Sequence, residues 1–95
     1  MILERAELLA KQGHEDSFAE MMQSSGCALL ASTPGCHSVR VGRGVENPAK
    51  FILLLEWETI EHHVALTKTD TFAEFRQLAA PHVRGAANME HFRML

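Results

Sequence analysis

The chain has 95 residues, of which 46% are hydrophobic and 22% are charged, and its formal net charge is −3. This length fits a single domain over residues 1–95, and the composition is that of an ordinary globular protein, not a disordered or disulfide-stapled one. The arginines are scattered and no basic field is available to neutralise phosphates, so nucleic acid is not expected as a partner.

Targeting and membrane segments are not expected either. The opening MILERAELLA carries charges within its apolar part and has no small-residue cleavage site, unlike a signal peptide. No run approaches the ~18 apolar residues of a membrane span. Because two cysteines imply no disulfide framework, the simplest interpretation is a cytoplasmic, reduced setting.

The first third of the chain predicts a strand followed by a helix. Residues 2–10 fit both a helical composition and a period of two, and we expect a strand because Gly13 breaks the run just before a clear helix. Residues 15–30 place Phe18, Met21, Met22 and Leu29 within one arc of a helical wheel. The same wheel puts Cys27 on the polar side, so an exposed thiol is expected there.

A hairpin is predicted next. Thr33-Pro34-Gly35 stops the helix, and residues 36–45 then alternate valines with Arg40, Gly42 and Gly44, as a half-buried strand does. Asn47-Pro48 is a turn signal, which makes residues 50–58 the second, antiparallel arm.

The second half predicts two helices and a last strand. Thr59 is a candidate cap for a short helix that carries His63, and Thr71 with Glu74 has the spacing of a capping box for a second helix. Pro81 ends that helix, and residues 88–95 alternate as a final strand.

This order predicts an α+β fold of the ferredoxin-like βαββαβ kind, with both helices on one face of an antiparallel sheet. In FILLL, Phe51, Leu53 and Leu55 point one way while Ile52 and Leu54 point the other, so both sheet faces require cover. Helices supply cover for only one face. A second subunit over the other face is the expected arrangement, giving a homodimer.

Most of the chain resembles a known family. The run PGCHSVRVGRGVENPAKFILLLEWETIEHHVALTKTDTFAEFRQLAAPHV, with the ending MEHF, is similar to the antibiotic biosynthesis monooxygenase domain family of the dimeric α+β barrel superfamily. The resemblance implies a dimeric α+β barrel. Members include enzymes that oxidise electron-rich aromatic polyketides with molecular oxygen and no cofactor, enzymes that degrade haem, and relatives that process small quorum signals. The haem branch has an Asn on the first strand and a His on the last helix, where this chain offers Ala6, Glu7 and Arg76, so haem degradation is disfavoured.

Two histidines are the candidate catalytic residues. The resemblance places His63 at the family's recurrent helical His, facing a cavity, where an imidazole can take a proton from a phenol. His91 lies in the C-terminal EHF, and His37 can join from a neighbouring strand. Each histidine has a structural alternative to a catalytic role. His63 would cap or pack its helix, and His91 would form a hydrogen bond across the sheet.

The candidate substrate pocket is apolar. Trp57 is either a core residue or a cavity wall that stacks on a planar substrate. Phe72, Phe75 and Met22 have core spacing and line a pocket only if the helices stand off the sheet. Arg76 either orients an anion or is solvated.

No metal and no cofactor are expected from the sequence. The chain has six His but no HxxxH, HExxH or CxxC motif, so histidine ligands would have to converge purely by folding. It also lacks a nucleophile elbow and a phosphate-binding glycine loop.

Three functions remain open. The first is a cofactor-independent monooxygenase that oxidises a small aromatic or quinol-like substrate with molecular oxygen. The second is a non-catalytic dimeric module that binds a small molecule, and the third is an isomerase of a small carbonyl compound on the same fold.

Overall fold

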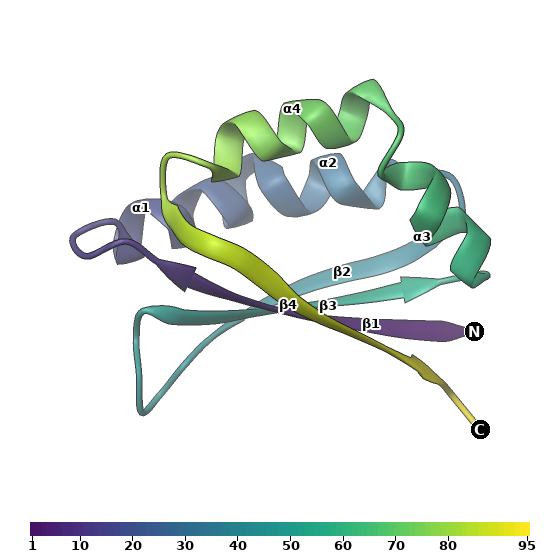
Figure 1. The fold of residues 1–95 in the computed structure, drawn as a ribbon, viewed down its shortest axis with the longest axis horizontal. Coiled ribbons are helices and arrows are strands. Elements are labelled where there is room, and N and C mark those ends of the chain that lie inside the picture. Colours follow the sequence, from purple (N-terminus) through teal and green to yellow (C-terminus); the bar gives the residue numbers. More distant parts are fainter.

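A four-stranded antiparallel sheet runs through the molecule, and every helix lies on the same face of it (Figure 1). The computed structural model describes residues 1–95. The strands, in the spatial order β2-β3-β1-β4, are β1 (Ile2–Ala10), β2 (Cys36–Arg43), β3 (Lys50–Trp57) and β4 (Val83–Arg93). The predicted α+β, ferredoxin-like arrangement is confirmed. None of the helices has the length and apolar character that a membrane crossing requires.

The helical layer consists of two segments that lie side by side above the sheet (Figure 1). The first segment contains α1 (Glu15–Met21), a π-helical stretch η1 (Met22–Gly26) and α2 (Cys27–Ala31). The second contains α3 (Ile60–Leu66) and α4 (Asp70–Ala79). Together they cover the face on which the apolar residues of β1 and β3 gather.

Strand alternation decides which residues enter the core. On β3, the side chains of Phe51, Leu53, Leu55 and Trp57 are all at most 4% exposed, whereas Ile52 and Leu54 between them are only half-buried. On β1, even-numbered residues face the helices, because Ala6 and Ala10 are buried and Ala6 pairs with Leu53. The period of two in the sequence therefore predicted the strand faces correctly.

The long first helix differs from the prediction at its centre. Residues 15–30 were expected to form one regular helix, but Met22–Gly26 form a π turn. A π turn contains one extra residue, which rotates all later side chains by roughly 100° relative to a regular helix. Cys27 is consequently half-buried and packed against the core, and the expectation of an exposed thiol was wrong.

The start of α4 and the length of β4 also differ from the prediction. The cap is Thr69, whose hydroxyl accepts a hydrogen bond from the backbone N–H of Phe72, so Thr71 lies inside the first turn. β4 begins at Val83, five residues earlier than expected, because its backbone already pairs with the end of β1. Gly85, with φ of 72°, lies within this early part of the strand.

His14 and His82 meet between the two connections at one end of the sheet. Both are half-buried, and their Nδ1 atoms lie 3.2 Å apart where the turn after β1 meets the turn before β4.

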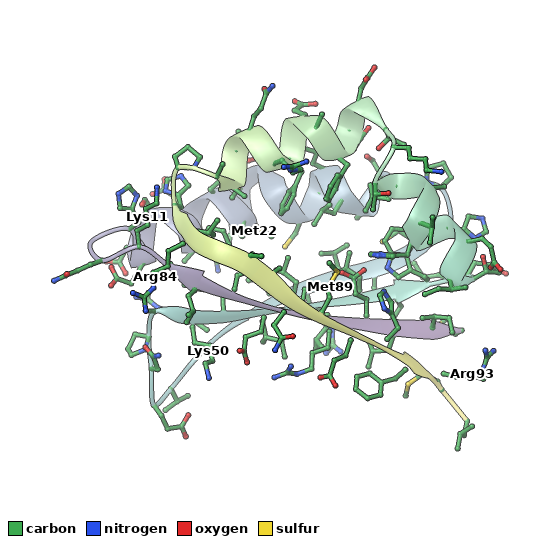
Figure 2. All side chains as sticks on the ribbon, viewed as in Figure 1. Lys11, Met22, Lys50, Arg84, Met89 and Arg93 are labelled. Carbon is green, nitrogen blue, oxygen red and sulfur yellow. The ribbon has the colours of Figure 1, made fainter.

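The sheet face opposite the helices has no cover within the chain. Register places Leu3 beside Phe92 and Arg5 beside both Leu54 and Glu90 on this face. Arg5 contacts Glu90 at 3.5 Å, and Figure 2 shows the side chain of Lys50 on the side of the sheet away from the helices. This uncovered face therefore mixes apolar side chains with ion pairs.

Candidate functional site

A cavity of about 360 Å³ lies between the sheet and the second helical segment. Its walls come from the helix-facing side of β1 and β3, from α2, α3 and α4, and from β4. It is lined by 19 residues, of which 14 are hydrophobic, so it suits a ligand with a largely apolar body. Phe72 and Phe75 from α4 lie in its lining, with their rings stacked at a centroid distance of 6.4 Å.

Small residues form the β4 wall of this cavity. Gly85, Ala86 and Ala87 line it consecutively, beside Val83 and Met89. The β1–β4 register is irregular between Glu7 and Leu9, which is where these small residues lie. A bulge next to small side chains leaves room that longer side chains would fill. Figure 2 shows Met89 on β4, the strand that closes this side of the site.

Glu4 is the charged residue most deeply placed in the lining. It occupies the helix-facing register of β1 between Ile2 and Ala6 and is only 5% exposed. Its Oε1 accepts a hydrogen bond of 2.9 Å from Nε1 of Trp57. A buried carboxylate requires such partners, because an unpaired one is costly to remove from water.

His63 is carried to the same point by α3. Thr59 caps this helix by accepting from the N–H of His62, and one turn of helix brings the imidazole of His63 over the sheet. Its Nδ1 lies 2.7 Å from Oε1 of Glu4, with side-chain exposures of 12% and 6%. This nitrogen is fully enclosed, and although it lies close to the carboxylate, the two groups do not form a well-aligned hydrogen bond.

His91 approaches the same pair from β4. It is directly opposite Glu4 in the β1–β4 register, which puts both side chains on the helix-facing side. Its ring lies 4.5 Å from the ring of His63, centroid to centroid, in an edge-on arrangement. Donor atoms of Glu4, His63 and His91 all lie within 4.8 Å of one another. His91 is exposed on its outer side.

Arg76 is the cationic residue of the cavity lining. It projects from α4 and is exposed, and no carboxylate forms an ion pair with it. A guanidinium at the edge of an apolar cavity favours ligands with an anionic or hydrogen-bond-accepting group at that end.

Three residues proposed from the sequence do not line the cavity. Trp57 is fully buried and contacts the site only through Glu4 and an edge-on contact with the His63 ring at 5.7 Å. Met22 is fully buried in the core, and Figure 2 shows its side chain reaching from the helical layer toward the sheet. His37 is at the surface, where its Nε2 lies 2.6 Å from Oε2 of Glu58.

Sequence reasoning missed Glu4. The period-two run Ile2, Glu4, Ala6 contained the signal, because a carboxylate in the register of buried residues has to find a buried partner. That partner, His63, is 59 positions away in the chain, so only the fold brings the two together.

The two cysteines take no part in the site. Burial raises the pKa of the Cys27 thiol above its ordinary value of 9.0. The pKa of Cys36 is raised mainly by burial and also by the charge of Glu4, against the lowering effect of its hydrogen bond to the Ser38 backbone. Both thiols are therefore poor nucleophiles at neutral pH.

Comparison with known proteins shows the family and the fold of the chain. The family description antibiotic biosynthesis monooxygenase matches residues 1–93. The uncharacterised protein YczJ of Bacillus subtilis (strain 168) is 26% identical over 94 residues, which is 98% of each chain. A crystal structure of a candidate antibiotic biosynthesis monooxygenase from Bordetella bronchiseptica superposes with a TM-score of 0.92 at 27% identity, covering 99% of this chain and 96% of the other. A second candidate from Nitrosomonas europaea, at 16% identity, shares the fold with a TM-score of 0.84, over 100% of this chain and 99% of its own. The resemblance seen in the sequence is thus confirmed, and the chain belongs to the antibiotic biosynthesis monooxygenase family.

Proposed function

We propose that this protein is a cofactor-independent monooxygenase that oxidises a small aromatic or quinol-like substrate with molecular oxygen. Family membership supports a monooxygenase-like activity in general. The observation that carries the finer proposal is the Glu4–His63 pair in the lining of a mainly apolar cavity. An activated base beside an apolar pocket is what deprotonation of an electron-rich phenol or enol requires.

The cavity provides binding and exclusion of water. A volume of about 360 Å³ is at the lower end of the range for small-molecule sites, which fits a substrate of a few fused rings at most. Phe72 and Phe75 offer aromatic faces for such rings. Arg76 is available to bind a polar substituent at the rim.

His63 is the proposed general base. The carboxylate of Glu4 beside Nδ1 favours the tautomer that is protonated there, which leaves Nε2 free to accept a proton. The same carboxylate stabilises the imidazolium formed by the transfer, as an acidic residue does in other histidine-based sites. His91, edge-on to the His63 ring, is proposed to hold the position of that ring.

The substrate supplies all the electrons in this scheme. Removal of the hydroxyl proton yields an electron-rich anion, which transfers an electron to dioxygen, and the two radicals combine at carbon. For a substrate in which a ring CH₂ becomes a carbonyl, one oxygen atom enters the product and the other leaves as water with the two hydrogens of the CH₂ group. Atoms and electrons balance, so the residues of the site only need to bind, deprotonate and exclude water.

We also propose that the working form is a homodimer that buries the uncovered sheet face. Leu3, Leu54 and Phe92 lie on that face with no cover from their own chain. Two sheets packed face to face are separated by about 10 Å, a distance that would bury these side chains. A dimer of this kind also extends a core that is thin for a 95-residue chain.

Two other functions use the same residues. A base beside an apolar cavity also suits proton abstraction next to a carbonyl, as in an isomerase, and the cavity alone suits a non-catalytic binding module. Consumption of oxygen distinguishes the proposed monooxygenase from the isomerase and from the binding module.

The test is oxygen uptake by the purified protein with a panel of anthrones, quinols and aldehydes, with EDTA present. Uptake that depends on both enzyme and substrate, with incorporation of one labelled oxygen atom into the product, supports the proposal. Isomerised product without oxygen uptake would assign the isomerase function. Tight binding of a panel member without any turnover would assign the binding module.

A further inference from the structure

Three metal-binding side chains from three separate elements converge at one end of the cavity. Glu4 comes from β1, His63 from α3 and His91 from β4, and one donor atom from each lies within 4.8 Å of the other two. We propose that these three residues form a binding site for a single divalent transition-metal ion. The inference does not rest on the proposed oxygenase activity, because it concerns binding by the protein alone. An ion bound at Nδ1 of His63 takes the place of the proton that the base form carries there, so the metal-bound form and the base form are alternative states of the same residues.

The geometry is close to what such an ion requires. With metal–ligand bonds of about 2.0–2.2 Å, neighbouring ligand atoms lie about 3–3.5 Å apart around the ion. The Glu4–His63 contact of 2.7 Å has to open slightly, and the longest separation, up to 4.8 Å, has to close by roughly 1.5 Å. His91 is exposed and lies on the strand next to the chain end, so rotation of its side chain can provide that change.

The buried nitrogen of His63 is an independent observation that favours a cation. Its Nδ1 is fully enclosed and has no aligned hydrogen-bond partner, although it is 2.7 Å from a carboxylate oxygen. Buried polar atoms in folded proteins nearly always have a partner. An ion placed between the nitrogen and the carboxylate satisfies both groups at once.

The ligand set indicates which ions fit. Two imidazoles and one carboxylate suit zinc, iron, cobalt and nickel, whereas magnesium and calcium prefer ligand sets composed of oxygen atoms. Three protein ligands leave one or more coordination positions for water or another small ligand, and the exposed side of His91 gives access to solvent. Trp57 donates a hydrogen bond to the Glu4 carboxylate. In metal sites, hydrogen-bond partners of this kind hold the ligands in place.

The chain contains a matched control for this proposal. His37 and Glu58 form a second imidazole–carboxylate contact at 2.6 Å, but they are exposed and no third donor residue is grouped with them. If proximity of one His and one carboxylate were enough, both pairs would bind metal equally. The proposal assigns tight binding only to the site with three donors.

The test is equilibrium dialysis of the purified full chain against zinc and, separately, cobalt(II), with elemental analysis. We expect one ion per chain, visible ligand-field absorption with cobalt, and quenching of the fluorescence of Trp57, the single tryptophan. His91→Ala and Glu4→Gln should each weaken binding by at least about 100-fold, because loss of an outer partner alone costs about 10–100-fold. His37→Ala should keep the stoichiometry and affinity of the wild type.

Three outcomes would overturn the proposal: no stoichiometric binding of either ion, binding that persists in both His91→Ala and Glu4→Gln, or binding that His37→Ala removes. A protein that binds the ion but consumes no oxygen would contradict the proposed function alone. A protein that consumes oxygen with EDTA present but binds no ion would contradict the metal site alone.

Discussion

Oε1 of Glu4 lies 2.7 Å from Nδ1 of His63 and 2.9 Å from Nε1 of Trp57, so one buried carboxylate oxygen joins the core of the protein to its candidate active site. Trp57 is fully buried, and His63 is in the lining of the cavity. A change at Glu4 should therefore affect both stability and chemistry, and different substitutions should separate the two effects.

Glu4→Gln and Glu4→Ala are expected to differ in stability. Gln retains an oxygen that accepts from Trp57 Nε1, whereas Ala leaves this buried N–H without a partner, at a cost of about 1–3 kcal/mol. Glu4→Ala should therefore unfold at lower urea concentration than Glu4→Gln, measured by Trp57 fluorescence. Equal midpoints for the two variants would mean that the Trp57 hydrogen bond contributes no stability.

Gly35 should be far more sensitive to substitution than Gly13. Both glycines have positive φ, 81° and 85°, so alanine strains the backbone at each by about 1–2 kcal/mol. A Cβ at Gly35 would also come within 2.2 Å of Cγ of His62, whereas a Cβ at Gly13 would meet nothing within 4 Å. Thermal unfolding should show Gly35→Ala to be clearly less stable than Gly13→Ala. Similar losses would mean that the His62 ring moves aside freely.

Leu54→Asp should dissociate the proposed homodimer. Leu54 is on the uncovered sheet face, beside Arg5, and an aspartate there would have to be buried between two sheets. Val64→Asp is the control, because Val64 is 48% exposed on α3, in the helical layer on the other side of the sheet (Figure 1). Analytical ultracentrifugation should find a dimer for the wild type and for Val64→Asp and a monomer for Leu54→Asp. A stable folded wild-type monomer at micromolar concentration would contradict the dimer.

The two cysteines should react slowly with alkylating agents in the folded protein. Burial raises the pKa of Cys27 and of Cys36 above 9.0, so less thiolate is present at a given pH than in the unfolded chain. The neutral thiols contribute stability that is complete below about pH 9, the unfolded pKa, and is lost as pH rises through the higher folded pKa values. Iodoacetamide rates across pH should give folded pKa values above 9.0. Values at or below the ordinary one would show that the thiols are not desolvated.

The fold was predictable because strand alternation is a local property. Phe51 to Trp57 alternate in burial as their sequence indicates, and the turn at Asn47-Pro48 fixes the hairpin. The π turn was not predictable from the wheel of residues 15–30, since one extra residue changes the direction of everything after it. The cap of α4 was misplaced because Thr69 and Thr71 offer the same hydroxyl, and only the folded backbone selects one of them.

The candidate site was predictable only in part, because it depends on contacts between residues that are far apart in the sequence. His63 and His91 were proposed from family resemblance, and the structure brings their rings to 4.5 Å. Glu4 was not proposed, because its role depends on the β1–β4 register and on the position of α3 over the sheet, both of which are long-range features. His37 was proposed as a neighbour, but its strand directs it to Glu58 at the surface.

The most direct test of His63 as the general base is its replacement by glutamine, with His62→Gln as the matched neighbour on the same helix. Glutamine is used at both positions because it can preserve the contact between His62 and Thr59 that supports the start of α3. Neither amide can act as a base near neutral pH. The measurement is oxygen uptake with the best substrate of the panel. We expect His63→Gln to lower turnover by about 10²–10⁴-fold with little change in unfolding, while the turnover of His62→Gln stays near that of the wild type. Equal turnover by the two variants would show that the imidazole of His63 is not the base.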